Sequence, residues 1–270
     1  MSAIARALEI SRPHLSSTIN AEPLSSKSRR KADDDELLQR IRPIVDARPS
    51  SGYRRVTAHL NRHLQAPRVN HKRVYRVMRE AALLLPKYAG NPPRAHTGRI
   101  ITMASDMRWC SDSFEIRCDN GERVHVAFSL DCCDREVIGW VAANRHLDGA
   151  DIRDLLALSV EARFRTTTTP RRIEWLTDNG PPYTAYETRA FARASGLIPR
   201  NTPAYSPESN GMAEAFVKTI KRDYVYLADL PNAETVLHLL PTWLDDYNEN
   251  QPHKGLKMLS PRQFRRLQTN

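Results

Sequence analysis

The sequence lacks any long apolar run, and no stretch of its 270 residues approaches the ~18 that a membrane-spanning helix needs. Its Ser- and Arg-rich beginning also lacks the apolar segment of a secretory signal. Both absences argue against a membrane or secreted protein. The sequence therefore predicts a cytoplasmic protein.

Cysteine is also scarce, with four residues in the chain. They form no CxxC pair and show no zinc-site spacing, so we expect reduced, structural thiols rather than disulfides or structural zinc. Hydrophobic residues make up 40% of the chain, which is enough for a real core in a protein of this length. The cysteines are Cys110, Cys118, Cys132 and Cys133.

Positive charge is abundant and unevenly distributed. The chain has 41 basic and 31 acidic residues, for a net charge of +10. Residues 51–100 hold 11 basic residues and 1 acidic residue, whereas residues 101–270 hold 21 and 23. A surplus of basic residues confined to 50 residues indicates a surface that binds a polyanion. The alternative is a basic face that only contacts solvent.

Three short helices are expected in this basic part of the chain. An acidic start at residues 33–36 precedes the first, and the others are expected at 54–63 and 70–82, each with an apolar stripe. The last helix is cationic on its outer face, as in helix-turn-helix proteins whose last helix enters the major groove. We therefore predict a helix-turn-helix DNA-binding domain over residues 33–85, with a basic surface helix of a larger fold as the alternative. Its predicted DNA contacts are Arg54, Arg55, Lys72, Arg73, Arg76 and Arg79.

Residues outside this domain divide into connecting segments and a second domain. Residues 1–32 are expected to be a partial helix-turn-helix or a linker, and residues 86–107, with three prolines and two glycines, a second linker. Residues 108–268 then show three strands followed by alternating helices and strands, which predicts a mixed α/β domain. The expected strands are 108–117, 124–130, 137–141, 172–177 and 197–201, and the expected helices are 149–164, 185–195, 208–227 and 233–247.

Two aspartates of this second domain stand on or next to predicted strands. Asp112 shares a strand face with apolar residues, where a carboxylate is costly unless it is paired, hydrogen-bonded or bound to metal. Asp178 follows the apolar strand 173–177, at the carboxyl end where sites of α/β sheets gather. Asp178-Asn179-Gly180 is also ordinary turn chemistry, which is the alternative interpretation.

A third acid, Glu214, lies early in a predicted long helix. Glu214, Lys218 and Lys221 project from one face of that helix at about 100° per residue. A solvated Glu/Lys pair is the alternative to a functional role. The three acids gain meaning only as a set.

As a set, they resemble a known pattern. Trp109-Cys-Ser-Asp112, Thr177-Asp178-Asn-Gly180 and the run from Pro203 through Glu214 to Lys221 resemble the DDE core of retroviral integrases and bacterial insertion-sequence transposases. Thirty-five residues separate Asp178 from Glu214, the spacing of the integrase-like subgroup. Gly52-Tyr-Arg-Arg55 and the segment 70–79 resemble the helix-turn-helix of OrfB-type transposases, which come from elements with two overlapping frames. The resemblance covers roughly residues 35–266.

This resemblance implies a fold, a site and a cofactor. The fold is a ribonuclease H-like core of the retroviral integrase superfamily, with a mixed five-stranded sheet after an all-α helix-turn-helix domain. Asp112, Asp178 and Glu214 would be the catalytic residues and would ligate two Mg²⁺ ions, with Mn²⁺ as a substitute. Further DNA contacts would come from Lys218, Lys221, Asn179 and Asn210.

The implied function is that of an insertion-sequence transposase. Such a protein binds terminal inverted repeats, cleaves DNA 3′ ends and transfers strands into target DNA. The implied partners are element-end and target DNA, further copies of the chain on DNA and the product of an upstream overlapping frame, in the nucleoid of a bacterial cytoplasm. An inactive relic or DNA-binding regulator, and a ribonuclease H-like nuclease, remain alternatives.

Overall fold

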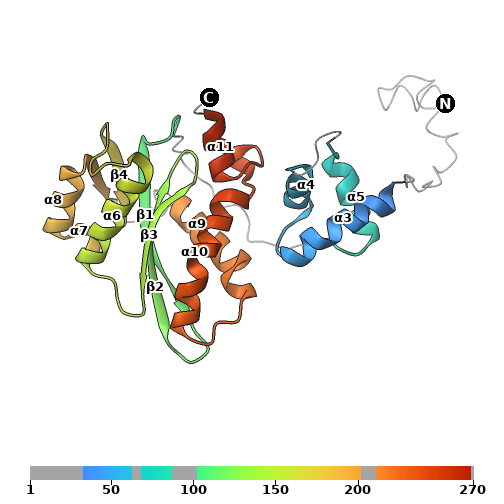
Figure 1. Ribbon diagram of the computed structural model, residues 1–270, viewed down its shortest axis with the longest axis horizontal. Coiled ribbons are helices and arrows are strands. Elements are labelled where there is room, and N and C mark those ends of the chain that lie inside the picture. Colours follow the sequence, from blue (N-terminus) through green and yellow to red (C-terminus); the bar gives the residue numbers. More distant parts are fainter. Residues whose placement is uncertain (1–32, 63–67, 87–101, 202–210, 269–270) are drawn as a thin grey trace, which may run out of the picture.

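A computed structural model describes residues 33–62, 68–86, 102–201 and 211–268 (Figure 1). The predicted segment 1–32 and most of the predicted linker 86–107 lie outside these described residues. No helix within the described ranges is long and apolar enough to cross a membrane.

Three helices form the amino-terminal unit where the apolar patterns predict them. They are α3 (Asp34–Ala47), α4 (Tyr53–Arg62) and α5 (His71–Glu80). The Asn70 side chain caps α5 by accepting a hydrogen bond of 2.9 Å from the Lys72 amide, as expected of asparagine at this position. The apolar stripes meet in one small core, made of Leu37, Ile41, Val56, Leu60, Val74, Val77 and Met78.

The second unit is built on a mixed five-stranded sheet with the order β3-β2-β1-β4-β5. β1 pairs antiparallel with β2, and β2 with β3, whereas β4 runs parallel to both β1 and β5. The sheet confirms the predicted architecture of a meander followed by parallel strands. The strands are β1 (Arg108–Arg117), β2 (Arg123–Asp131), β3 (Val137–Ala143), β4 (Ile173–Thr177) and β5 (Leu197–Asn201).

Helices cover both faces of this sheet (Figure 1). One face packs against α9 (Gly211–Asp223) and α10 (Ala233–Asn250) through a core that contains Phe128 and Phe216. The other face packs against α6 (Gly149–Phe164) and α8 (Tyr186–Ala194), with Trp109 and Trp175 fully buried. The alternation of side chains along β1 supplies both cores, because successive residues point to opposite faces.

Two helices differ from the sequence prediction. The long helix expected to reach Leu227 ends at Asp223 and gives way to the 3₁₀ turn η2 (Val225–Leu227). Helix α11 (Pro261–Gln268) was not predicted, although Ser260 and Gln263 carry a capping-box signal: the Ser260 amide donates to Gln263 and the Gln263 amide donates to Ser260. The remaining short elements are α7 (Pro181–Thr184) and η3 (Lys254–Leu256).

The two units meet through arginines of the helical unit and polar groups of α9, α10 and α11. Arg48 donates to Asp246 at 2.6 Å and Arg55 to Asp223 at 3.1 Å. Arg62 donates to Asn250 and to Gln263 at 2.7 and 2.8 Å. The basic surplus of residues 51–100 therefore also contributes to contacts within the chain.

Candidate active site

Asp112 on β1 and Asp178, the residue that follows β4, occupy matching positions along two neighbouring parallel strands. The register pairs Cys110 of β1 with Leu176 of β4, and each aspartate comes two residues later along its own chain segment. Neighbouring strands are about 4.8 Å apart, so this register brings the two carboxylates to the same edge of the sheet. Both residues are half-buried.

Backbone amides hold each aspartate in place locally. The Ser113 amide donates to Asp112 Oδ1 at 2.8 Å, and the Gly180 amide donates to Asp178 Oδ1 at 3.0 Å. A Cβ added at Gly180 would lie 3.0 Å from the same Asp178 oxygen, so a glycine suits this turn. The turn that the Asp-Asn-Gly sequence predicts thus orients the carboxylate.

The charges of both aspartates affect the side chain of Tyr183. Its side chain is buried, and burial together with the charges of Asp112 and Asp178 raises the pKa of its hydroxyl well above the usual range. A tyrosine whose pKa is raised by the charges of two carboxylates lies near both of them. The two acids therefore share one electrostatic environment beside Tyr183.

Glu214 stands apart from this pair in the structure. Its side chain is half-exposed on α9, and its Oε2 atom lies 3.4 Å from Lys218 Nζ. Lys221 Nζ lies 5.8 Å from the centre of the Phe114 ring, which is on β1 two residues after Asp112. No three His, Cys, Asp or Glu side chains within the described ranges are close enough together to hold a metal ion.

The donor chemistry nonetheless fits a hard divalent cation. Carboxylate oxygens are the ligands that Mg²⁺ prefers, and the register of β1 and β4 brings two carboxylates to one edge of the sheet. The helix that carries Glu214 packs directly against β1, so the third acid belongs to the same region of the fold. Asn179 is exposed beside Asp178 and accepts a hydrogen bond of 2.9 Å from Asn201, whereas Asn210 lies outside the described residues.

The predicted DNA contacts of the helical unit divide into two groups. Lys72 and Arg79 are exposed on α5 together with Tyr75. Arg73 and Arg76 instead turn toward the buried Asp34 of α3, at 2.8 and 2.6 Å. The outer face of α5 is therefore less cationic than its sequence suggests.

Arg54 and Arg55 point to different surroundings. Arg54 is exposed and packs over the Tyr53 ring, 5.4 Å from its centre. Arg55 is half-buried against Asp223 of the second unit. The two adjacent arginines therefore lie at the boundary between the units.

One acidic cluster was not foreseen from the sequence. Arg163 of α6 is almost fully buried and contacts four carboxylates at 2.5 to 3.3 Å, those of Asp106, Asp131, Asp134 and Glu136. Burial and the neighbouring Asp134 raise the pKa of Asp131 to about 6. Because the guanidinium occupies the centre of this cluster, the cluster is an ion-pair network of the core.

Comparisons with known proteins agree with this architecture. Residues 32–89 match the HTH-like domain family, and residues 104–207 and 195–261 match two Integrase core domain families. The chain is 44% identical over 273 residues to "Transposase InsD for insertion element IS2A/D/F/H/I/K" of Escherichia coli, a match that covers 98% of this chain and 91% of that protein. The chain belongs to the insertion-element transposase family. The prediction that it is an OrfB-type transposase with an integrase-like core is confirmed.

A second relative and a solved structure agree with the family and the fold of this transposase. Transposase InsD for insertion element IS2-9 of E. coli is also 44% identical, and the match covers 89% of that protein. A chain of the simian T-cell lymphotropic virus intasome, in complex with a PP2A regulatory subunit, shares the fold with a TM-score of 0.52 at 17% identity, over 83% of this chain and 73% of that one. The predicted ribonuclease H-like, integrase-type fold and DDE-type enzyme class are therefore confirmed. DNA is the partner of this transposase, and its core family uses divalent metals.

Proposed function

We propose that Asp112, Asp178 and Glu214 are the catalytic carboxylates of this transposase and hold two Mg²⁺ ions, which Mn²⁺ can replace. The shared register of Asp112 and Asp178 supports the proposal most directly. Two such ions supply activation of the attacking oxygen and stabilisation of the leaving oxygen. Glu214 would supply the third carboxylate by leaving its contact with Lys218.

The chain's own groups then position the DNA. Lys218 and Lys221 lie on the same face of α9 as Glu214 and bind phosphates next to the scissile bond. Water forms a new P–O bond at the end of the element and the bond to the 3′ oxygen breaks, which frees a 3′-hydroxyl. That hydroxyl then attacks a phosphodiester of the target, whose own 3′ oxygen leaves. Asn179 and Asn210 contribute further DNA contacts near the site.

Binding of the element ends is assigned to the helical unit. Lys72 and Arg79 contact DNA from the exposed face of α5, and Arg54 adds a contact at the boundary with the core. The other predicted contacts, Arg55, Arg73 and Arg76, are paired with acids, and we assign them to holding α4 and α5 in place for DNA binding. The domain boundaries of this division are residues 33–85 for DNA binding and 108–268 for catalysis.

Assembly belongs to the same proposal. Joining two element ends to one target requires at least two copies of the chain on DNA. The product of an upstream overlapping frame is a further proposed partner, and the nucleoid is the proposed location because the substrate is there.

The test is a cleavage and strand-transfer assay with the full chain, labelled element-end duplexes, target DNA and Mg²⁺ or Mn²⁺. Wild-type protein should give both cleaved ends and joined products. Asp112→Asn, Asp178→Asn and Glu214→Gln should give neither, whereas Asp154→Asn, an exposed acid of α6, should behave as wild type. Equal activity in the three variants would refute the site, and cleavage without joining would identify a nuclease.

A further inference from the structure

A basic surface lies on the catalytic core where β4 begins. It is formed by the loop 165–172, which follows α6, and by the neighbouring segment 188–201 of α8 and β5. Residues 101–270 as a whole are slightly acidic, with 21 basic and 23 acidic residues. The segments 162–173 and 188–201 nonetheless contain no Asp or Glu, and all their charged residues are arginines. They are Arg163, Arg165, Arg171, Arg172, Arg189, Arg193 and Arg200.

Backbone hydrogen bonds hold the two segments side by side. The Thr169 amide donates to the Ser195 carbonyl at 2.9 Å, and the Ile173 amide donates to the Gly196 carbonyl at 3.3 Å. Gly196 has a φ of 87°, and a Cβ at this position would overlap Thr169 Oγ1, so a glycine lets the loop pack closely against the end of α8. The arginines of the loop and of α8 therefore share one surface.

The charges of this surface are exposed and mostly lack acidic partners. Arg200 shares Glu174 with Arg108, and Arg171 donates to the Ser105 carbonyl at 2.7 Å. Clusters of cations without acidic partners attract polyanions. Within the described ranges, no ion pair involves the exposed Arg165, Arg171, Arg172 and Arg193.

The loop also presents hydroxyl groups between its cations. Thr166, Thr167 and Thr168 are exposed between Arg165 and Arg171. Arginine and threonine side chains both bind phosphate oxygens of DNA, and such contacts carry no sequence information. The surface is built from a loop and the carboxyl end of α8, whereas bases are read by a helix or strand that enters a groove. Its contacts should therefore be with phosphates.

The basic surface is separate from both DNA-binding regions of the proposed function. Arg172 precedes Asp178 by six residues across β4, which corresponds to about 20 Å of strand. Figure 1 shows α8 on the side of the core away from α3, α4 and α5. The helical unit is proposed to bind the element ends, so the position of this surface suits a second DNA segment.

We propose that this basic surface binds the phosphate backbone of target duplex DNA, independently of its sequence. The inference rests on the proposed function in taking target DNA as a substrate. A distance of about 20 Å corresponds to about six base pairs of B-DNA at 3.4 Å each, so a target that reacts at the three acids extends far enough to reach the surface. The surface would hold the target while an element end is joined to it.

The test measures binding of a labelled duplex of about 20 base pairs without an element end, by fluorescence anisotropy on the full chain without divalent metal. Arg165→Gln, Arg171→Gln and Arg172→Gln combined should lower the salt slope by about 3, one for each lost phosphate contact. Lysine at the same three positions should keep the slope, because it also binds phosphates as a positive charge. Arg117→Gln, an exposed cation at the opposite end of β1, is the matched control and should bind as wild type.

Several results would overturn the inference. One is an unchanged salt slope in the glutamine variant, or an equal decrease in Arg117→Gln. Another is a lysine variant that fails to keep the slope, since this would assign the arginines to the stability of the loop and of the helix ends. Polyglutamate that competes as well as unlabelled duplex would assign the surface to an acidic protein.

A strand-transfer assay with Mg²⁺ separates this inference from the catalytic proposal. The glutamine variant should cleave element ends as wild type and join them to target less, and equal losses of cleavage and joining would contradict a role in target binding. Asp112→Asn should lose cleavage while keeping the salt slope of duplex binding. Failure of the catalytic proposal and failure of the target surface therefore give different results.

Discussion

Asp112 and Asp178 stand two residues beyond the paired residues Cys110 and Leu176, at equivalent points on adjacent parallel strands. In the proposed function these two carboxylates, which strand register and backbone amides hold in place, form half of the cation site. Glu214 lies on a helix and is paired with Lys218 at 3.4 Å, so its contribution requires a side-chain rearrangement. The three acids should therefore differ in how they affect metal binding.

Metal binding without DNA should depend on the two aspartates more than on Glu214. Asp112→Asn and Asp178→Asn should each weaken Mn²⁺ binding by more than about 100-fold, since even supporting residues of metal sites change affinity by 10- to 100-fold. Glu214→Gln should weaken it less than either. Isothermal titration calorimetry would measure this, with Asp154→Asn as the control. A larger effect for Glu214→Gln would contradict the order given by the structure.

Helix α5 should bind DNA through its exposed cations. Lys72→Ala and Arg79→Ala should each weaken binding to element ends and lower the salt slope by about 1, as expected for one lost phosphate contact. Arg76→Ala should instead lower the free energy of unfolding by about 2 kcal/mol, because Arg76 bonds to the buried Asp34. Anisotropy titrations at several salt concentrations and urea unfolding would separate the effects. A lower salt slope for Arg76→Ala without a stability loss would contradict this division.

The contact between the units should loosen when its acids are neutralised. Asp223 accepts hydrogen bonds from Ser50, Arg55 and Gln251, and Asp246 accepts from Arg48. The double change Asp223→Asn and Asp246→Asn should therefore raise the radius of gyration in small-angle scattering. An unchanged radius would show that the arginines do not hold the units together. Asp154→Asn should leave the radius unchanged.

Arg163 should be among the most sensitive residues for stability. Arg163→Met would leave four buried carboxylates without their shared cation, and breaking such a network costs about 3–5 kcal/mol. Arg145→Met removes an exposed pair with Asp151 and should lower the free energy of unfolding far less. Urea unfolding would compare the two. Similar losses would contradict a central role for Arg163.

Stability should fall in mild acid through His59 and His253. Burial, with nearby arginines, lowers their pKa values to about 4 and about 3. The unfolded chain binds protons below its ordinary histidine value of 6.5, whereas the folded chain does not, so stability is lost as the pH falls from 6.5 toward 4. Each histidine contributes up to about 1.4 kcal/mol per pH unit. Asp131, with its raised pKa, opposes this loss between about 6 and 3.8.

The histidine contribution is isolated by comparing variants. His59→Gln and His253→Gln should show a shallower loss of unfolding free energy between pH 6.5 and 4 than the wild-type chain. An exposed histidine change, His238→Gln, should leave the slope unchanged. Parallel slopes for all four proteins would refute the assignment.

The sequence by itself determined most of the secondary-structure elements and the kind of side chain at the candidate site. It did so through the strand alternation around Asp112, the turn after Asp178 and the face shared by Glu214, Lys218 and Lys221. These are local properties, since periodicity and turn chemistry depend on near neighbours. The Asn70 cap was recognisable for the same reason. Family resemblance then indicated that distant acids act together.

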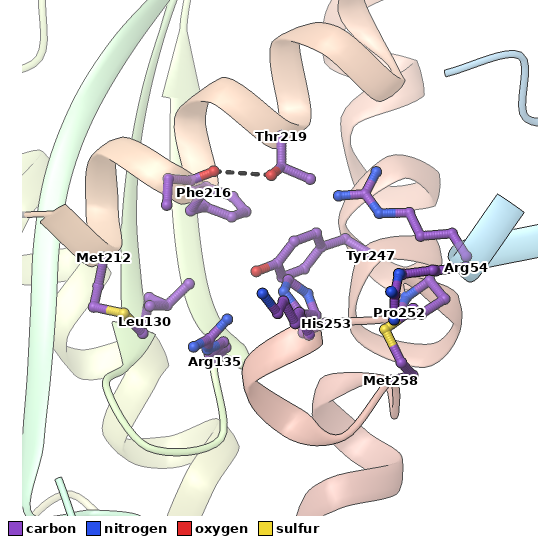
Figure 2. Close-up of a pocket in the computed structure, with 13 residues that line it drawn as sticks. Arg54, Leu130, Arg135, Met212, Phe216, Thr219, Tyr247, Pro252, His253 and Met258 are labelled. Carbon is purple, nitrogen blue, oxygen red and sulfur yellow. Dashed lines mark hydrogen bonds between the residues drawn. The ribbon is translucent and has the colours of Figure 1, made fainter. Parts of the chain in front are cut away.

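Only the tertiary structure decided which charged side chains are paired within the protein and which are exposed. Arg73 and Arg76 turn to Asp34, Arg55 turns to Asp223, and Arg163 gathers acids from separate segments. Such pairings join residues far apart in the chain, and no local pattern encodes them. A cavity between the two units arises in the same way, because its lining comes from α4, α9, α10 and the turn at Arg135 (Figure 2).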